Sequence, residues 1–293
     1  VAALLRPAIY PRPRASITHC QTHISHVFLA GDRVYKLKKA VRFPFLDFSH
    51  LDARRRYCEA EVELNRRLCP DIYLGVVKIS RAGSEFTLDG PGEAVDYAVC
   101  MRRLPSESML DQRVADRRLR AGWESDLARL LVRFHAAAAS DARVARYGTV
   151  SVLADRWQRE VAAVDSFVGT FLSAESQHVL ATFGPKFLTE RGGLFARRHR
   201  DGYIREGHGD LHCRNICDVE VGTTEVPAGL YVFDCIEFSE EFRCNDVASE
   251  LAFLTMDLEA RERPDLAAAV LDAYVNHSKD RELPALLPFY AAY

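Results

Sequence analysis

The first third of the chain alternates short β-rich runs with turn residues. Runs at 24–29 and 33–39 flank Gly31-Asp32, and a Gly-Asp step between two such runs is typical of a tight hairpin. Further runs of this kind occupy 72–79, 85–88 and 94–101. The pattern predicts a small antiparallel sheet.

One longer amphipathic segment, at 50–68, predicts a helix among these strands. Tyr57, Glu61, Leu64 and Leu68 recur at i, i+4, i+7 and i+11, so they share one helical face. Glu61 is thus an acid embedded in an apolar stripe, and a buried acid needs a partner.

After Pro105 the apolar residues take up the period of helices. Helices are predicted at 125–139, 151–166, 174–191, 246–260 and 264–278. Strands first and helices second indicate an α+β architecture of two lobes. We expect these lobes to cover residues 1–103 and 104–293.

Charge and cysteine usage narrow the possible partners and the compartment. The net charge is −2, so no basic field favours nucleic acid, and no apolar stretch reaches the roughly 20 residues that span a bilayer. The eight cysteines form no Cys-x-x-Cys pair, which predicts a reducing, cytoplasmic compartment. Neither nucleic acid nor a membrane is expected as a partner.

Polar side chains interrupt the helical part near residues 208–234. Short β-runs at 215–220 and 230–233 predict an antiparallel hairpin, which brings Asn215 close to Asp234. Asp210 lies in the loop that leads into this hairpin. Three oxygen-bearing side chains of this kind suit Mg²⁺, a hard cation that prefers oxygen ligands.

A zinc site is the alternative for this segment, since His208, His212, Cys213 and Cys217 have suitable ligand types. His212 and Cys213 are sequence neighbours, so their side chains would point apart. This geometry favours the magnesium interpretation.

The string HGDLHCRN at 208–215, followed by Phe233-Asp234, resembles the catalytic motifs of the aminoglycoside phosphotransferase and choline kinase family. The resemblance implies a protein-kinase-like fold with a small antiparallel-sheet N-lobe, a mostly helical C-lobe, and the use of ATP and Mg²⁺. Asp210 would then be the catalytic base, while Asn215 and Asp234 would hold the metal ions. His208 would be a structural member of this loop, and His212 would help to position phosphate.

A kinase-like site also needs a strand lysine paired with a helix glutamate. Lys36 and Lys38 are two residues apart, so both face the same side of their strand. Lys36 fits the family pattern better, through Val34-Tyr35-Lys36. We expect Lys36 to pair with Glu61, and which of the two lysines contacts the phosphates stays open.

The strand at 94–101 has the placement of the hinge that binds adenine in this family. The resemblance implies adenine contacts from the backbone of Cys100, Met101 and Arg103. No G-x-G-x-x-G loop precedes the lysine strand; residues 21–26 stand there instead. We expect Ser25 to replace the amides of the glycine loop.

Longer runs at 23–39, 45–68 and 233–261 resemble one bacterial subgroup. In that subgroup a P-loop ATP-binding domain follows the phosphotransferase-like domain on the same chain. No G-x-x-x-x-G-K-[ST] is present here, and the apolar, uncapped end at Tyr293 predicts that the chain continues. Asp246 matches an aspartate of the family, and we expect it to anchor the loop or a helix N-terminus.

These features predict transfer of the ATP γ-phosphate to a hydroxyl of a small molecule. Two alternatives are a non-catalytic, nucleotide-binding regulatory module and a protein kinase; no A-P-E segment follows Asp234. The acceptor is not readable, because family members use antibiotics, choline, sugars and amino-acid-derived alcohols. One set of acids would bind a cationic acceptor or would simply be solvated: Glu237, Glu240, Glu241, Asp257 and Glu259.

Overall fold

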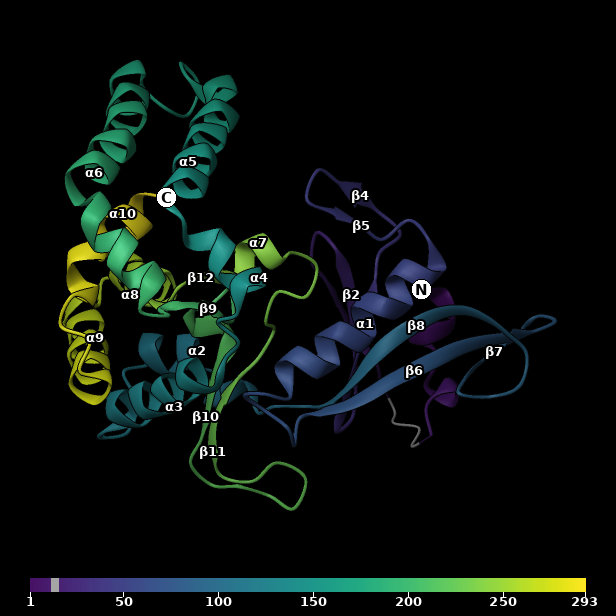
Figure 1. Cartoon of the computed structure of the whole chain (residues 1–293). Coiled ribbons are helices and arrows are strands. Elements are labelled where there is room, and N and C mark those ends of the chain that lie inside the picture. Colours follow the sequence, from purple (N-terminus) through teal and green to yellow (C-terminus); the bar gives the residue numbers. More distant parts are fainter. Residues whose placement is uncertain (12–15) are drawn as a thin grey trace. The chain divides into compact units, whose positions relative to one another are not determined.

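The computed structural model describes residues 1–11 and 16–293, and these form two compact units (Figure 1). The first unit joins Val1–Leu119 to Arg214–Ser239. The second joins Arg120–Cys213 to Glu240–Tyr293. Segment 214–239 thus belongs with the N-terminal part, whereas the predicted lobes divide once, after residue 103; that boundary stays a prediction.

The first unit is mainly sheet. Its strands and helices are β1 Thr18–Gln21, β2 Ser25–Ala30, β3 Arg33–Lys38, β4 Arg42–Phe43, β5 Leu46–Asp47, α1 Leu51–Asn65, β6 Tyr73–Ala82, β7 Glu85–Leu88, β8 Glu93–Arg102, α2 Leu110–Ala115, β10 Ile216–Val219 and β11 Gly229–Val232.

Within the described residues, six strands form one sheet in the order β1-β2-β3-β8-β6-β7. Every neighbouring pair is antiparallel. β2 and β3 pair from Ser25↔Lys38 to Ala30↔Arg33 around the Gly31-Asp32 turn, which confirms the predicted hairpin. β3, the lysine strand, lies between β2 and β8 and is therefore held on both edges.

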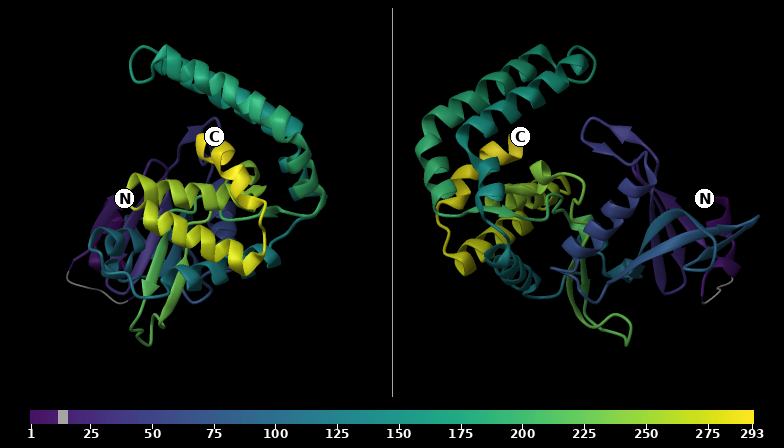
Figure 2. Two further views of the ribbon diagram at one scale, coloured as in Figure 1. Left: turned by 90° about the vertical axis from the view of Figure 1, so that its left-hand side faces the viewer. Right: turned by 45° about the vertical axis from the view of Figure 1, so that its right-hand side comes forward.

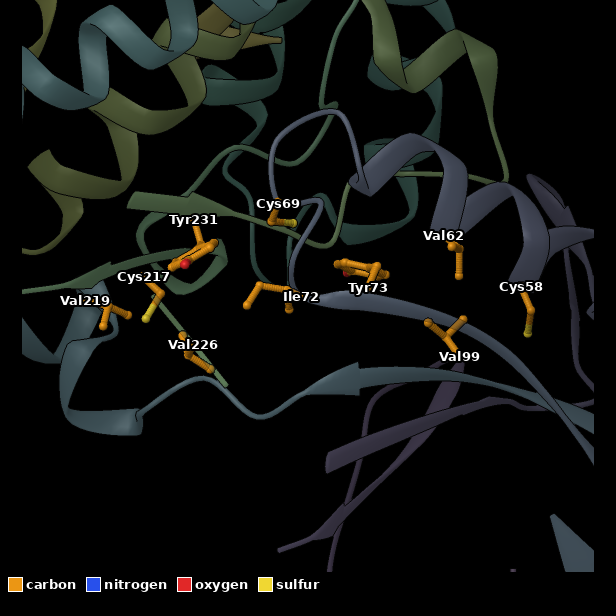
Figure 3. Packing of buried hydrophobic residues seen from close by; sticks show 10 residues of the cluster. All are labelled: Cys58, Val62, Cys69, Ile72, Tyr73, Val99, Cys217, Val219, Val226 and Tyr231. Atoms are coloured by element: carbon orange, nitrogen blue, oxygen red, sulfur yellow. The ribbon is translucent and has the colours of Figure 1, made fainter. Parts of the chain in front are cut away.

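The β10–β11 hairpin packs on the core of this unit. Cys58 and Val62 of α1, Tyr73 of β6 and Val99 of β8 share one buried cluster with Tyr231 of β11 (Figure 3). Burying one side chain of this size stabilises a fold by roughly 1.5–3 kcal/mol. This packing explains why 214–239 groups with the sheet although it is distant in sequence.

The second unit is mainly helical. Its elements are α3 Trp123–Ala137, α4 Ala142–Ala145, α5 Val150–Val164, α6 Ala174–Arg200, β9 Ile204–Glu206, α7 Glu240–Arg243, β12 Cys244–Asp246, α8 Val247–Ala260, α9 Pro264–Ser278 and α10 Leu287–Ala292. α5 and α6 run side by side, and α9 packs against α8 (Figure 2). None of the helices formed by the described part of the chain combines the length and apolar character that crossing a membrane requires.

The predicted order of a sheet followed by helices is confirmed. The largest difference in the helices is α6, which was expected to end at 191 and continues to Arg200. Gly192 and Gly193 therefore lie inside a helix, where they cost stability relative to alanine but do not end it.

Candidate functional site

Two lysines of β3 and three carboxylates form a cluster in the first unit. Lys36 and Lys38 share one face of the strand, as their spacing predicts. Lys36 Nζ lies 2.9 Å from Glu61 Oε1, and Lys38 Nζ lies 2.7 Å from Glu61 Oε2. The predicted ion pair between Lys36 and Glu61 is thus present, and the same carboxylate also binds Lys38.

Glu61 is fully buried on α1. The buried face of this helix carries Cys58, Val62 and Asn65 beside Glu61. It is therefore rotated from the predicted stripe, in which Tyr57 and Leu64 flanked the acid. Glu61 is buried in both arrangements, because it lies near the centre of each.

Asp234 and Glu237 follow β11 and complete the cluster. Lys36 also donates to Asp234, and Lys38 to Glu237. The Asp234 side chain is 41% exposed, whereas the Lys38 and Glu237 side chains are almost fully buried. Of these lysine partners, Asp234 is therefore the one open to a ligand.

The backbone of Asp234 adopts a left-handed conformation, with φ 66°. Aspartate tolerates this region better than most residues. The Asp234 N–H donates to the Tyr73 hydroxyl (3.2 Å), and the Cys235 N–H donates to Asn65 Oδ1 (2.9 Å). Two side chains of the sheet and helix thus fix the turn that presents the carboxylate.

The carboxylates keep Lys36 charged. Burial disfavours its ammonium form, but the nearby Asp234 and Glu61 outweigh burial and hold the pKa of Lys36 well above its usual value. Burial likewise raises the pKa of Glu237, while the Lys38 ammonium opposes this shift. Lys36 therefore presents a permanent positive charge beside a half-exposed carboxylate.

Asn215 reaches the same end of the hairpin as Asp234. Ile216 pairs with Val232, and the Phe233 N–H donates to the Asn215 carbonyl at 3.0 Å. The predicted closeness of Asn215 and Asp234 is thus present in the backbone register. An amide oxygen and a half-exposed carboxylate fit Mg²⁺, which takes one or two carboxylates together with waters and substrate phosphates.

The zinc alternative requires a Cys217 thiolate, and the surroundings of Cys217 in the first unit do not support one. Cys217 is buried in the cluster with Tyr231, and burial raises its pKa to about 12, whereas zinc binds thiolates. Among the residues that the structure describes, no group of three or more His, Cys, Asp or Glu side chains could hold a metal ion.

The turn between β1 and β2 is short and closed by its own hydrogen bonds. The Ser25 N–H donates to Thr22 Oγ1 (3.0 Å), and the Thr22 N–H donates to the Ser25 carbonyl (2.9 Å). The Ser25 hydroxyl is buried and has no hydrogen-bond partner within residues 1–11 and 16–293. Its expected role in holding phosphate stays a prediction.

The expected adenine contacts lie where the backbone is already engaged. Cys100 and Met101 are in β8, with ladder partners in both β3 and β6. The Arg103 N–H donates to the Asp32 carbonyl at 2.9 Å. Adenine recognition by these three residues stays a prediction.

In the second unit, Glu250 of α8 anchors the loop that carries His208 and Asp210. One oxygen of Glu250 accepts from the backbone N–H groups of His208 and Gly209, and the other lies 2.7 Å from His135 Nε2. A Cβ at Gly207 would lie 2.1 Å from this carboxylate, so only glycine permits the approach. Glu250 was not predicted from the sequence, although it lies in an apolar helical run as Glu61 does.

Asp210 is presented from this anchored loop. Its backbone N–H donates to His208 Nδ1 at 3.2 Å, and His208 is fully buried, which confirms its structural place in the loop. The Asp210 carboxylate is 36% exposed and lies 3.5 Å from His212 Nε2. Three residues further on, the Cys213 N–H donates to Asp257 Oδ2 at 2.9 Å.

Asp246 has the expected structural role. It caps α8 by accepting from the Ala248 N–H (2.9 Å) and binds Arg198 through both oxygens (2.7 and 2.8 Å). Arg198 also reaches Asp280 at 2.8 Å, and all three side chains are buried. This cluster fixes the start of the helix that carries Glu250.

Most of the acids considered for a cationic acceptor are engaged in ion pairs. Glu237 binds Lys38 in the first unit. In the second unit, Glu240 pairs with Arg143, Glu241 with Arg156, and Asp257 with Arg261. These pairs leave little uncompensated negative charge for binding a cation.

We predict that Glu250→Gln destabilises the chain by about 1.5–3 kcal/mol at neutral pH, because a charged acceptor of two backbone N–H groups is lost. Burial alone would raise the pKa of Glu250, but His135 and the loop N–H groups lower it to about 2. A carboxyl with a lowered folded pKa contributes stability above its unfolded pKa of ~4.3 and loses it as the pH falls.

The difference in the free energy of unfolding between the parent chain and Glu250→Gln should therefore shrink as the pH falls from 6 toward 3. Urea denaturation at several pH values measures it. Glu259→Gln, at an exposed position of the same helix, is the control and should show no such trend. A pH-independent difference would contradict the anchoring role.

No protein-family model matches the chain. It is 34% identical over 273 residues to uncharacterized proteins of Mycobacterium tuberculosis and Mycobacterium bovis, a match that covers 93% of this chain and 52% of each relative. The chain thus spans about half the length of the curated relatives it matches.

A crystal structure of a choline/ethanolamine kinase family protein from Mesorhizobium loti superimposes with a TM-score of 0.51 at 12% identity, covering 99% of this chain and 80% of that one. The fold is kinase-like. The predicted α+β fold with a sheet part and a helical part is confirmed by this likeness, whereas membership of the expected family stays a prediction. The bacterial subgroup stays a prediction.

Proposed function

We propose that this chain is an ATP- and Mg²⁺-dependent phosphotransferase that moves the γ-phosphate to a hydroxyl of a small molecule. The observation that carries the proposal is the ion pair of Lys36 with the buried Glu61, extended to the half-exposed Asp234. A charged lysine held beside an open carboxylate is the arrangement that kinase-like enzymes use at ATP phosphates. The fold likeness supports the same class.

Each residue has one task in this proposal. Lys36 donates to phosphate oxygens, and Glu61 fixes its ammonium. Asp234 and Asn215 would hold Mg²⁺, which neutralises charge on the phosphates when bound. Asp210 accepts the proton of the acceptor hydroxyl as its oxygen bonds to phosphorus and ADP leaves.

Replacing the two lysines separately should separate their tasks. Lys36→Met is expected to weaken binding of Mg·ATP by about tenfold or more, since a charge-assisted contact to phosphate is lost. Lys38→Met is expected chiefly to lower stability, by about 3 kcal/mol, because it removes the ammonium that buried Glu61 and Glu237 share. Calorimetric titration and urea denaturation of both variants measure this. If Lys38→Met instead weakens binding of Mg·ATP and Lys36→Met chiefly lowers stability, Lys38 is the phosphate ligand.

The short β1–β2 turn favours a second candidate, a nucleotide-binding regulatory module without catalysis. Closed by Thr22 and Ser25, it offers no glycine loop to grip phosphate. Such a module would bind Mg·ATP but transfer nothing to an alcohol.

Incubating the chain with Mg·ATP and a panel of small alcohols, sugars, choline and aminoglycosides decides between the two. ADP formation that depends on one acceptor supports the phosphotransferase. Nucleotide binding without acceptor-dependent turnover supports the module.

A further inference from the structure

A pocket of about 360 Å³ lies beside the loop of Asp210 in the second unit. Gly209 and Leu211, the two sequence neighbours of Asp210, both line it. Its volume falls at the lower end of the roughly 300–1,000 Å³ typical of small-molecule sites. Asp210 itself does not line the pocket, but the loop that carries it forms part of the wall.

One wall of the pocket is a face of α8. Ser249, Phe253 and Met256 line it at i, i+4 and i+7, so they point the same way. Phe253 is 36% exposed, whereas the apolar residues Leu251, Leu254 and Leu258 of the same helix are buried. Tyr290 and Tyr293, from the end of the chain, also line the pocket. The walls thus offer aromatic faces together with a hydroxyl.

The two carboxylates that line the pocket are both compensated. Glu241 accepts from Arg156 (3.0 Å) and also from Arg159. Glu250 is occupied by the loop N–H groups and by His135. Among the described residues, Glu241 is thus neutralised by two guanidinium groups that do not themselves line the pocket, and Glu250 is held by hydrogen bonds.

This charge balance bears on the acceptor. An ammonium compound gains most from an uncompensated carboxylate, and the guanidinium groups of Arg156 and Arg159 repel it. Aromatic faces alone also suit quaternary ammonium groups, but that gain must outweigh the same repulsion. A neutral polyol meets no such cost: its C–H faces pack on the rings and its hydroxyls bond to groups such as Ser249.

Resting on the proposed function, we infer that the pocket takes an uncharged polyhydroxyl acceptor of monosaccharide size rather than an ammonium compound. In the reaction, one hydroxyl oxygen of this acceptor bonds to the γ-phosphorus. Its proton passes to Asp210, and the bond to the ADP oxygen breaks.

Matched pairs of probes test the inference: glucose against glucosamine, glycerol against ethanolamine, and inositol against choline. Each compound is titrated into the chain by calorimetry without nucleotide and then assayed for ADP formation with Mg·ATP. At least one neutral member is expected to exceed its ammonium counterpart by about tenfold or more in affinity and in kcat/KM.

Two substitutions and one control tie the result to this pocket. Phe253→Ala should weaken binding of the preferred neutral compound by about tenfold. Phe171→Ala, the same change at an 84% exposed position of the same unit, should have no effect. Arg159→Gln removes one cation from Glu241 and should raise the relative affinity for the ammonium members by roughly two- to fivefold.

A preference for the ammonium members in the parent chain would overturn the inference. So would the failure of all six compounds to bind while Mg·ATP binds normally, a result that leaves the nucleotide part of the proposed function standing. If Mg·ATP itself does not bind, the proposed function fails, and the titrations without nucleotide still decide whether the pocket selects neutral polyols.

Discussion

Asp210→Asn is expected to slow phosphoryl transfer by about 10²–10⁴ while leaving the affinity for Mg·ATP nearly unchanged. Asparagine keeps the size of the side chain and some of its hydrogen bonding but cannot accept the hydroxyl proton. The backbone contacts of the loop, from Glu250 and from His208 to the Asp210 N–H, do not involve the replaced carboxylate. Turnover number and nucleotide affinity are the two measurements.

Asp272→Asn serves as the matched control, since Asp272 is an exposed acid on α9 of the same unit. It should retain the parental rate. If Asp210→Asn also turns over at the parental rate, Asp210 is not the base. If unfolding of the variant accounts for the whole loss of rate, Asp210 instead has a structural role.

Asp234→Asn is expected to remove most of the gain in ATP affinity that Mg²⁺ provides, a loss of roughly 30-fold or more. Asparagine is the right replacement, because it tolerates the left-handed backbone at this position, with φ 66°, where alanine would add strain. The fold should survive, since the Tyr73 hydroxyl contacts the Asp234 backbone rather than its carboxylate. ATP titrations with and without Mg²⁺ measure the effect.

The same unit provides a close control. Asp89 is also a left-handed aspartate, with φ 52°, and it is exposed. Asp89→Asn should keep the full magnesium dependence. Equal magnesium dependence in Asp234→Asn and the parent chain would show that the metal binds elsewhere.

Much of the fold could be predicted because its signals are local. The Gly31-Asp32 turn between β-rich runs predicted the β2–β3 hairpin, and the two-residue spacing placed Lys36 and Lys38 on one face. The burial of Glu61 followed from helical periodicity even though the true buried face is rotated toward Cys58. In each case the residues that carry the signal are close together in the sequence.

What the sequence could not predict depends on contacts between distant segments. Arg156 and Glu241 are 85 positions apart, so no local pattern shows that this acid is neutralised. The pairing of Arg198 with Asp246 is equally remote. The helix expected over 174–191 continues to Arg200 through Gly192 and Gly193, although glycine lowers helix propensity.

Glu250 belongs to the candidate site but was not predicted from the sequence. It lies in the apolar run of α8, and the reasoning that selected Glu61 would have selected it too. Its partners could not be predicted, because they are the backbone N–H groups of His208 and Gly209 and a histidine on α3. A buried acid can be found from the pattern, but what it binds requires the fold.

Detection of the phosphorylated acceptor is the most direct test of the proposed phosphoryl transfer. The chain is incubated with Mg·ATP and the neutral polyols, and phosphorus NMR follows the γ-phosphate. Phosphotransferase activity predicts a new phosphomonoester signal that needs both Mg²⁺ and the acceptor, and that is lost or strongly reduced in Asp210→Asn. Tight binding of Mg·ATP with no ester formed from any neutral, ammonium or aminoglycoside compound would contradict it and favour the regulatory module.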